Sequence, residues 1–298
     1  MPYSKLVNSR PIAVAVSLNP RKLSYISSRA IGLSAAALFL IVGCSAGGTT
    51  PPGTPGTSSS QPAGTPLTAG RALLANARQE QKLTSVTEAI SVQVNGATTT
   101  SGTVQVQRIP TFEVSEDLKI AAAGKHTQLK AILAGTAFYI NEPALATHFG
   151  KPWLKLDLAG LSKGPLAFLA QIVSSVKSND FVNQTQLLAQ AKNARVIGKQ
   201  TVDGVPTTEY GGSVRAATAL KALGPNVRKA LGPVLRILGN SIVSFHIWID
   251  AQNHTRKVTE VETINGEHVA TTVNISGINQ PVHISPPPAS QTFTPPGG

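Results

Sequence analysis

Segments with alternating apolar and polar residues are separated by dipeptides typical of tight β-turns, and this pattern constrains the fold more than any other feature. The dipeptides are Asn95-Gly96, Asp203-Gly204 and Asn265-Gly266. Each dipeptide favours a two-residue hairpin loop, because its two residues adopt positive φ readily. The clearest alternation lies in residues 242–250, where Val243, Phe245 and Ile247 share one face. The pattern therefore predicts antiparallel strands joined by hairpins.

The order of the predicted elements indicates the fold class. We expect a helix at 71–83, five strands within 84–140, two helices before residue 195, strands at 195–202 and 205–214, helical pieces at 215–238, and strands at 242–250, 255–263 and 267–275. Hairpins dominate and no strand–helix–strand alternation occurs, which favours an α+β fold. A sheet of about ten strands must curl. We therefore predict a large, strongly curved antiparallel sheet, a half-barrel, with helices packed on its concave face.

The N-terminal segment has the composition of an export signal. Basic residues precede an uncharged apolar run at 30–42, which is too short to span a bilayer but suits a signal peptide. The single cysteine of the chain, Cys44, follows directly after this run and Gly43. The junction resembles the lipobox of bacterial lipoproteins, which implies cleavage of the signal peptide 1–43 and attachment of a diacylglycerol to the Cys44 thiol. The alternatives are a buried cysteine or an uncleaved anchor.

Lipidation of Cys44 implies a protein held at the extracytoplasmic face of the cell membrane, because two or more acyl chains anchor stably. Residues 44–70 then form a Gly/Ser/Thr/Pro tether that cannot bury enough surface to fold. The folded domain is expected at 71–284, and the Pro-rich tail 285–298 is expected to be disordered. The formal net charge of +12 is dispersed along the chain, so nucleic acid is a weaker interpretation than anionic lipid.

Several motifs, in their order, resemble bacterial lipoproteins of the LppX/LprG/LprF type and their LolA-like relatives. These motifs are KPWLKLD at 151–157, VDGVPTTEY at 202–210 and FHIWIDAQN at 245–253, downstream of the lipobox and tether. The resemblance implies a half-open curved sheet closed by helices, with an apolar cavity for acyl chains between them. It also implies carriage or sensing of lipids or lipoproteins, without catalysis and without a cofactor.

Candidate ligand-binding residues come from the apolar helical stripes and from the two tryptophans. They are Trp153, Phe168, Leu169, Ile172, Leu231, Leu235 and Trp248. A tryptophan suits the mouth of a lipid cavity because its ring is amphipathic. The alternative is that the same residues simply form a filled core. In that case the chain would be a structural or signalling lipoprotein that binds an unidentified protein partner and carries no lipid.

Two patterns typical of catalytic sites were weighed against this interpretation. Residues 160–164 match G-x-S-x-G, and Asp250 and His254 follow in the order of a hydrolase triad. That motif belongs to parallel α/β sheets, however, and Asp250 and His254 flank a predicted hairpin turn. The six histidines lack the spacing and the acidic neighbours of a metal site. We therefore expect neither an enzyme nor a metal centre.

Overall fold

The computed structural model describes residues 66–122, 124–158, 181–215, 242–264 and 266–295. The strands are β1 (Ser85–Val94), β2 (Ala97–Gln107), β3 (Glu113–Ala122), β4 (Lys125–Ala134), β5 (Ala137–Asn141), β6 (Trp153–Asp157), β7 (Arg195–Val202), β8 (Val205–Arg215), β9 (Ile242–Asp250), β10 (Thr255–Ile264), β11 (Glu267–Ser276) and β12 (Thr292–Phe293). The helices are α3 (Pro66–Glu80), α4 (Pro143–Phe149), α6 (Phe181–Leu188) and a 3-10 turn at Ala289–Gln291.

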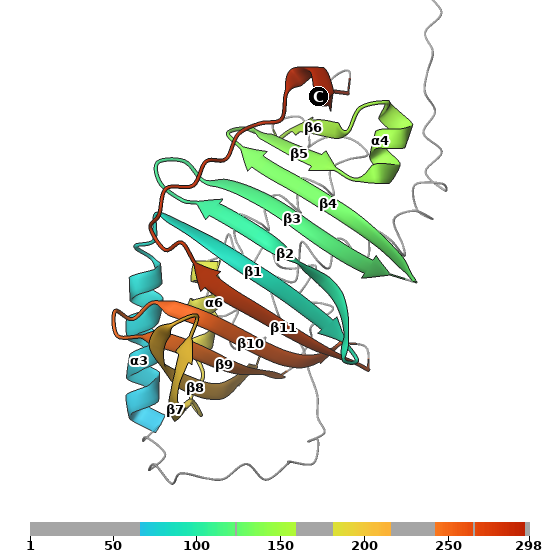
Figure 1. The fold of residues 1–298 in the computed structure, drawn as a ribbon. Helices are drawn as coiled ribbons and strands as arrows, with labels where there is room; N and C mark the ends of the chain where they lie inside the picture. Colours follow the sequence, from blue (N-terminus) through green and yellow to red (C-terminus); the bar gives the residue numbers. More distant parts are fainter. Residues whose placement is uncertain (1–65, 123, 159–180, 216–241, 265, 296–298) are drawn as a thin grey trace, which may run out of the picture.

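The described strands form one 12-stranded sheet in the order β12-β6-β5-β4-β3-β2-β1-β11-β10-β9-β8-β7 (Figure 1). All neighbours are antiparallel except β12 and β6, which are parallel. The first strand, β1, pairs with β11, so strands far apart in the sequence lie side by side in the middle of the sheet. The predicted fold class, an α+β protein with one large curved antiparallel sheet, is confirmed.

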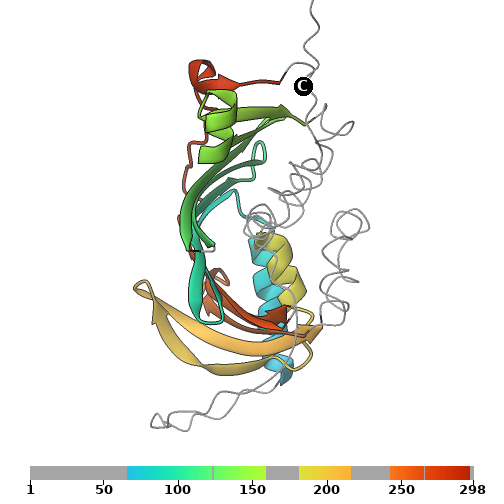
Figure 2. The ribbon, with the colours of Figure 1, turned by 90° about the vertical axis from the view of Figure 1, so that its right-hand side faces the viewer.

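The sheet bends strongly between its two halves, and its helices lie on the concave side (Figure 2). Helices α3 and α6 pack against each other, and they contact β7 and β8 respectively. Both lie beside the half of the sheet formed by β7–β11, whereas no helix in the described residues covers the concave face of β3–β5 (Figure 2). The helix α3 presents Ala69, Leu73 and Ala77 to the interior, a four-residue spacing that places them on one face.

Two of the three predicted hairpin turns fall within the described residues, and both are confirmed. Asn95 and Gly96 have φ values of 50° and 82°, and Asp203 and Gly204 have φ values of 48° and 80°. Positive φ at both central residues matches the right-handed twist of the flanking strands, which is why Asn-Gly and Asp-Gly occur there. The third turn includes Asn265, which lies outside the described residues.

The N-terminal boundary and the 141–157 region differ in detail from the sequence expectation. Helix α3 begins at Pro66 and not at residue 71, since proline is well suited to a first helical turn. Residues 153–157 were not counted among the predicted strands, yet they form β6 beside β5. Helix α4 lies directly after the five strands expected within 84–140, in a stretch for which no strand was predicted. Short elements of this kind are decided by the neighbours they pack on and not by their own periodicity.

The C-terminal tail is the main correction, because its residues up to 295 are part of the fold. Thr292 and Phe293 form β12, which pairs with Trp153 and Leu154 of β6. The Phe293 ring stacks on the Phe149 ring at 4.7 Å. The Lys151 amine donates a hydrogen bond of 2.7 Å to the Ser290 carbonyl. A segment too poor in apolar residues to fold alone can still order when it covers an open sheet edge.

Candidate functional site

Rows of apolar side chains cross the concave face of β1–β6. One row consists of Val86, Val106, Val114, Leu133, Phe138 and Leu156, which are paired neighbours on six successive strands. Each of these side chains is buried and belongs to the main hydrophobic cluster. The row spans about 24 Å, at about 4.8 Å between neighbouring strands. The face is therefore a continuous apolar surface and not a set of separate patches.

Four glutamates interrupt the apolar concave side of the whole sheet, one each on β1 and β3 and two on β10. Glu88, Glu116, Glu260 and Glu262 replace apolar residues in the alternation of their strands, and each is at most 3% exposed. The strand pairing places Glu116 of β3 opposite Val104 of β2, and Val104 opposite Glu88 of β1. Burying an acidic group is costly unless it is neutralised or paired. These positions are therefore the chemically distinctive ones on the concave face.

Glu116 differs from every other described carboxyl in its surroundings. Among the described residues, neither of its oxygens has a hydrogen-bond partner. Its direct neighbours across the strands on the same face are Val104 and Ala131. Burial raises the pKa of the Glu116 carboxyl from its ordinary 4.5 to about 7. Near neutral pH a large fraction of this group is therefore an uncharged carboxylic acid, able to donate and accept a hydrogen bond.

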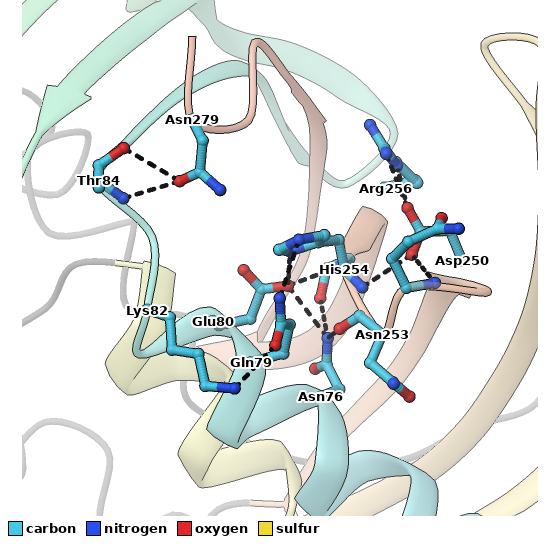
Figure 3. Close-up of polar contacts among 12 residues, drawn as sticks. Asn76, Gln79, Glu80, Lys82, Thr84, Asp250, Asn253, His254, Arg256 and Asn279 are labelled. Carbon is cyan, nitrogen blue, oxygen red and sulfur yellow. Dashed lines mark hydrogen bonds and ion pairs between the residues drawn. The ribbon is translucent and has the colours of Figure 1, made fainter.

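A second polar cluster joins α3 to the turn between β9 and β10 (Figure 3). Glu80 Oε1 accepts hydrogen bonds from the Thr255 backbone N–H at 2.7 Å and from Asn76 Nδ2 at 3.2 Å. The Asn76 amide also donates to the Asn253 carbonyl at 2.8 Å. His254 Nδ1 lies 3.6 Å from Glu80 Oε1. These contacts hold α3 firmly on the sheet and give Glu80 a structural role.

The arrangement of Asp250 and His254 that a catalytic triad needs is not formed. Asp250 Oδ1 accepts the backbone N–H of His254 at 2.9 Å, and Asp250 Oδ2 lies 2.7 Å from the Arg256 guanidinium nitrogens Nε and NH2. The His254 ring faces Glu80 and Gln79 instead. The third predicted member, Ser162, lies outside the described residues. The contacts of Asp250 thus fix the β9–β10 turn and do not orient a histidine base.

The structure places both candidate tryptophans on the other, convex face of the sheet. Trp248 alternates with Ile247, which faces the core, and its indole N–H donates a hydrogen bond of 2.6 Å to Gln200. The Lys257 amine lies 4.7 Å from the centre of the Trp248 ring. Trp153 alternates with the buried Leu154 on β6 and is half-buried. We therefore expect neither ring to contact a ligand on the concave face.

The remaining predicted site residues lie outside the described residues. They are Cys44, Phe168, Leu169, Ile172, Leu231 and Leu235. No group of His, Cys, Asp and Glu suited to a metal ion occurs among the described residues. Within the same residues, no helix has the length and apolarity to cross a membrane.

Comparison with known proteins gives structural neighbours only. No protein-family model matches the chain, and no curated protein matches it. LprF from Mycobacterium bovis is 16% identical, covering 74% of this chain and 97% of that chain with a TM-score of 0.48. The Mycobacterium tuberculosis lipoprotein LppX is 22% identical, covering 72% and 99% respectively with a TM-score of 0.44. A LolA superfamily protein from Nitrosomonas europaea is 10% identical, covering 74% and 96% respectively with a TM-score of 0.22.

LprF and LppX are of the type that the sequence was expected to resemble. The fold described above rests on the strand pairing of this chain and not on these neighbours.

Glu116 was missed by the sequence analysis, although the sequence contained a signal for it. Val114, Leu118 and Ile120 alternate regularly on β3, and Glu116 occupies the one polar position in that series.

Proposed function

We propose that this protein is a membrane-anchored lipoprotein that binds the hydrocarbon part of a lipid or amphiphile against the concave face of its curved sheet. The observation that carries the proposal is the continuous apolar surface across β1–β6, on the side of the sheet where α3 and α6 cover only the β7–β11 half (Figure 2). Transfer of acyl chains from water to such a surface contributes about 0.8 kcal/mol per buried CH₂.

The amphipathic segments predicted within 159–180 and 216–241 would serve as the cover of the bound chain in this proposal. Their candidate contacts are Phe168, Leu169, Ile172, Leu231 and Leu235. Cys44 would carry the acyl anchor that keeps the binding domain close to its lipid source. The names of the neighbours, which include lipoproteins and a LolA superfamily protein, are consistent with this function.

The proposal is tested by mass spectrometry of organic extracts from the purified full-length chain carrying Cys44→Ser, which has no acyl group of its own. We expect a lipid to co-purify, and we expect a fluorescent fatty-acid probe to compete with it. Val104→Phe fills space on the concave face and should reduce probe affinity by about tenfold or more. Thr103→Phe, one residue along β2 on the opposite face, should leave the affinity unchanged.

A chain that yields no lipid and binds no probe would contradict the proposal. That result would favour the alternative in which the same fold binds a protein partner. Anchoring has a separate test, because Cys44→Ser should release the protein from membranes into the soluble fraction. Retention of the variant on membranes would contradict lipidation at Cys44 without bearing on the ligand.

A further inference from the structure

The side chain of Glu116 lies among apolar neighbours on every side of the concave face. The strand pairing surrounds it with Val104, Ala131, Val114, Leu118, Val106, Gly102, Leu133 and Leu129. Glu116 is 3% exposed, and both of its oxygens lack a hydrogen-bond partner among the described residues. Leaving a buried polar group without any partner is among the most unfavourable arrangements in a protein core.

Packing gives no reason for a carboxyl at this position. Leu118 and Val114 occupy the same face of β3, and a leucine at 116 would continue their contacts with the strands on either side. At Gly102, in the neighbouring row, any side chain would overlap the backbone carbonyl of Asp117. On β2, that row therefore contributes no side chain next to Glu116, although Leu118 of β3 lies in the same row. The carboxyl thus lies at a place where no group among the described residues satisfies it.

We propose that Glu116 is the polar recognition point of the concave face and that it binds a lipid carrying a hydroxyl group on its hydrocarbon part. This inference rests on the proposed function and specifies its ligand class. A neutral carboxyl group has one O–H donor and one C=O acceptor, and a hydroxyl complements both. Apolar rows flank Glu116 on both sides, so the group that reaches it must itself be embedded in hydrocarbon.

Other ligand chemistries fit this position less well. An anionic head group such as a phosphate would meet a carboxyl that can ionise and would be repelled. An amine would bring a second charge into an apolar surface, where an ion pair gains little over its desolvation cost. An unsubstituted acyl chain would leave both oxygens of Glu116 unsatisfied. The nearest other acidic residue on the face of the described strands is Glu88, two strands away in the same row.

The test compares stearic acid with a panel of hydroxystearic acids. Each member of the panel differs from stearic acid by one hydroxyl group, at a different position of the chain. Binding is measured by calorimetry on the full-length chain with Cys44→Ser, at a pH below the Glu116 pKa of about 7. We expect at least one hydroxystearic isomer to bind about tenfold more tightly than stearic acid, the equivalent of one well-made hydrogen bond. Glu116→Leu should abolish this preference while leaving stearic acid binding intact or stronger.

Two further variants distinguish recognition from a merely structural role. Glu116→Gln keeps a donor and an acceptor and should preserve most of the preference. Asp117→Leu removes the adjacent carboxyl on the other face, where Asp117 is paired with Lys130 at 3.2 Å, and should leave the preference unchanged. Glu116→Leu should also raise the melting temperature, which shows that a loss of binding does not come from unfolding.

Four outcomes would overturn the inference. If stearic acid binds and no hydroxystearic isomer binds more tightly, the proposed function stands and the recognition point is refuted. The same holds if the preference survives Glu116→Leu, or if stearylamine binds more tightly than the hydroxylated probes. If neither fatty acid binds, the proposed function itself fails, and the inference fails with it.

Discussion

Two glutamates are buried almost equally deeply in this protein, and their surroundings are opposite. Glu80 on α3 is 0% exposed and receives hydrogen bonds from Thr255 and Asn76, beside the β7–β11 half of the sheet. Glu116 on β3 is 3% exposed and has no hydrogen-bond partner among the described residues, in the β1–β6 half. In one half the protein's own groups thus hold Glu80 through Oε1, although Glu80 Oε2 has no hydrogen-bond partner among the described residues. In the other half neither oxygen of Glu116 has such a partner.

The difference indicates how the two halves divide their tasks. The hydrogen bonds of Glu80 and Asn76 fix the helix that follows the predicted tether, so this half behaves as the rigid support of the domain. An unpartnered carboxyl lowers stability, and proteins retain such groups mainly where they act on something else. We therefore expect replacement of Glu80 and of Glu116 by an apolar residue to change stability in opposite directions.

The largest expected effect is a loss of stability from Glu80→Leu. The substitution leaves the Thr255 N–H without its buried acceptor and removes one of the acceptors of the Asn76 amide, and we expect the free energy of unfolding to fall by about 3 kcal/mol. Urea denaturation measures the change. Glu80→Gln retains the acceptor oxygen and should cost less, and Arg78→Ala on the exposed side of α3 should cost almost nothing. A decrease in unfolding free energy of less than about 1 kcal/mol for Glu80→Leu would contradict the proposed difference between Glu80 and Glu116.

The next effect is a pH dependence that belongs to Glu116. Its pKa is about 7 in the folded protein and 4.5 ordinarily, so the unfolded chain loses this proton first as the pH rises. The stability that Glu116 contributes by holding its proton in the folded state is therefore fully present below pH 4.5. It declines between pH 4.5 and about 7 and is lost at higher pH. This shift in the pKa of Glu116 corresponds to at most about 3 kcal/mol in the free energy of unfolding.

Glu116→Gln isolates this contribution, because glutamine does not titrate. We expect the difference in unfolding free energy between wild type and variant to change by about 2–3 kcal/mol across that window, in favour of the variant at the higher pH. Denaturation curves at several pH values measure it. Asp117→Asn should show the opposite sign at lower pH, since hydrogen bonding by Gln128 lowers the pKa of Asp117. Parallel curves for wild type and Glu116→Gln would show that Glu116 is not buried as described.

The smallest effect concerns the edge of the half that contains Glu116. Phe293→Ala removes the ring stacked on Phe149 and weakens the pairing of β12 with β6, at an expected cost of about 1 kcal/mol. Hydrogen exchange of the β6 amides should accelerate while that of β9 stays unchanged. Phe293→Leu keeps apolar contact and should cost less. Unchanged exchange in β6 would mean that the C-terminal segment does not protect this edge.

The sequence was sufficient to predict the sheet but not the composition of its concave face. Hairpin turns such as Asn95-Gly96 and the alternation in β9 are local signals, since turn geometry and side-chain period act within a few residues. Trp153 and Trp248 were predicted as ligand contacts from their chemistry alone. Their actual face follows from strand parity, which places the core-facing Leu154 and Ile247 on the opposite side.

What the sequence by itself determined is most of the strands, most of their turns and the antiparallel fold class, because these depend on periodicity and on local backbone preferences. The tertiary structure alone decided that β1 pairs with β11 and that the C-terminal residues close the edge at β6. It also decided that Glu80 has hydrogen-bond partners, whereas Glu116 has none among the described residues. Those outcomes depend on which residues far apart in the chain share a row or a face, and no local pattern encodes that.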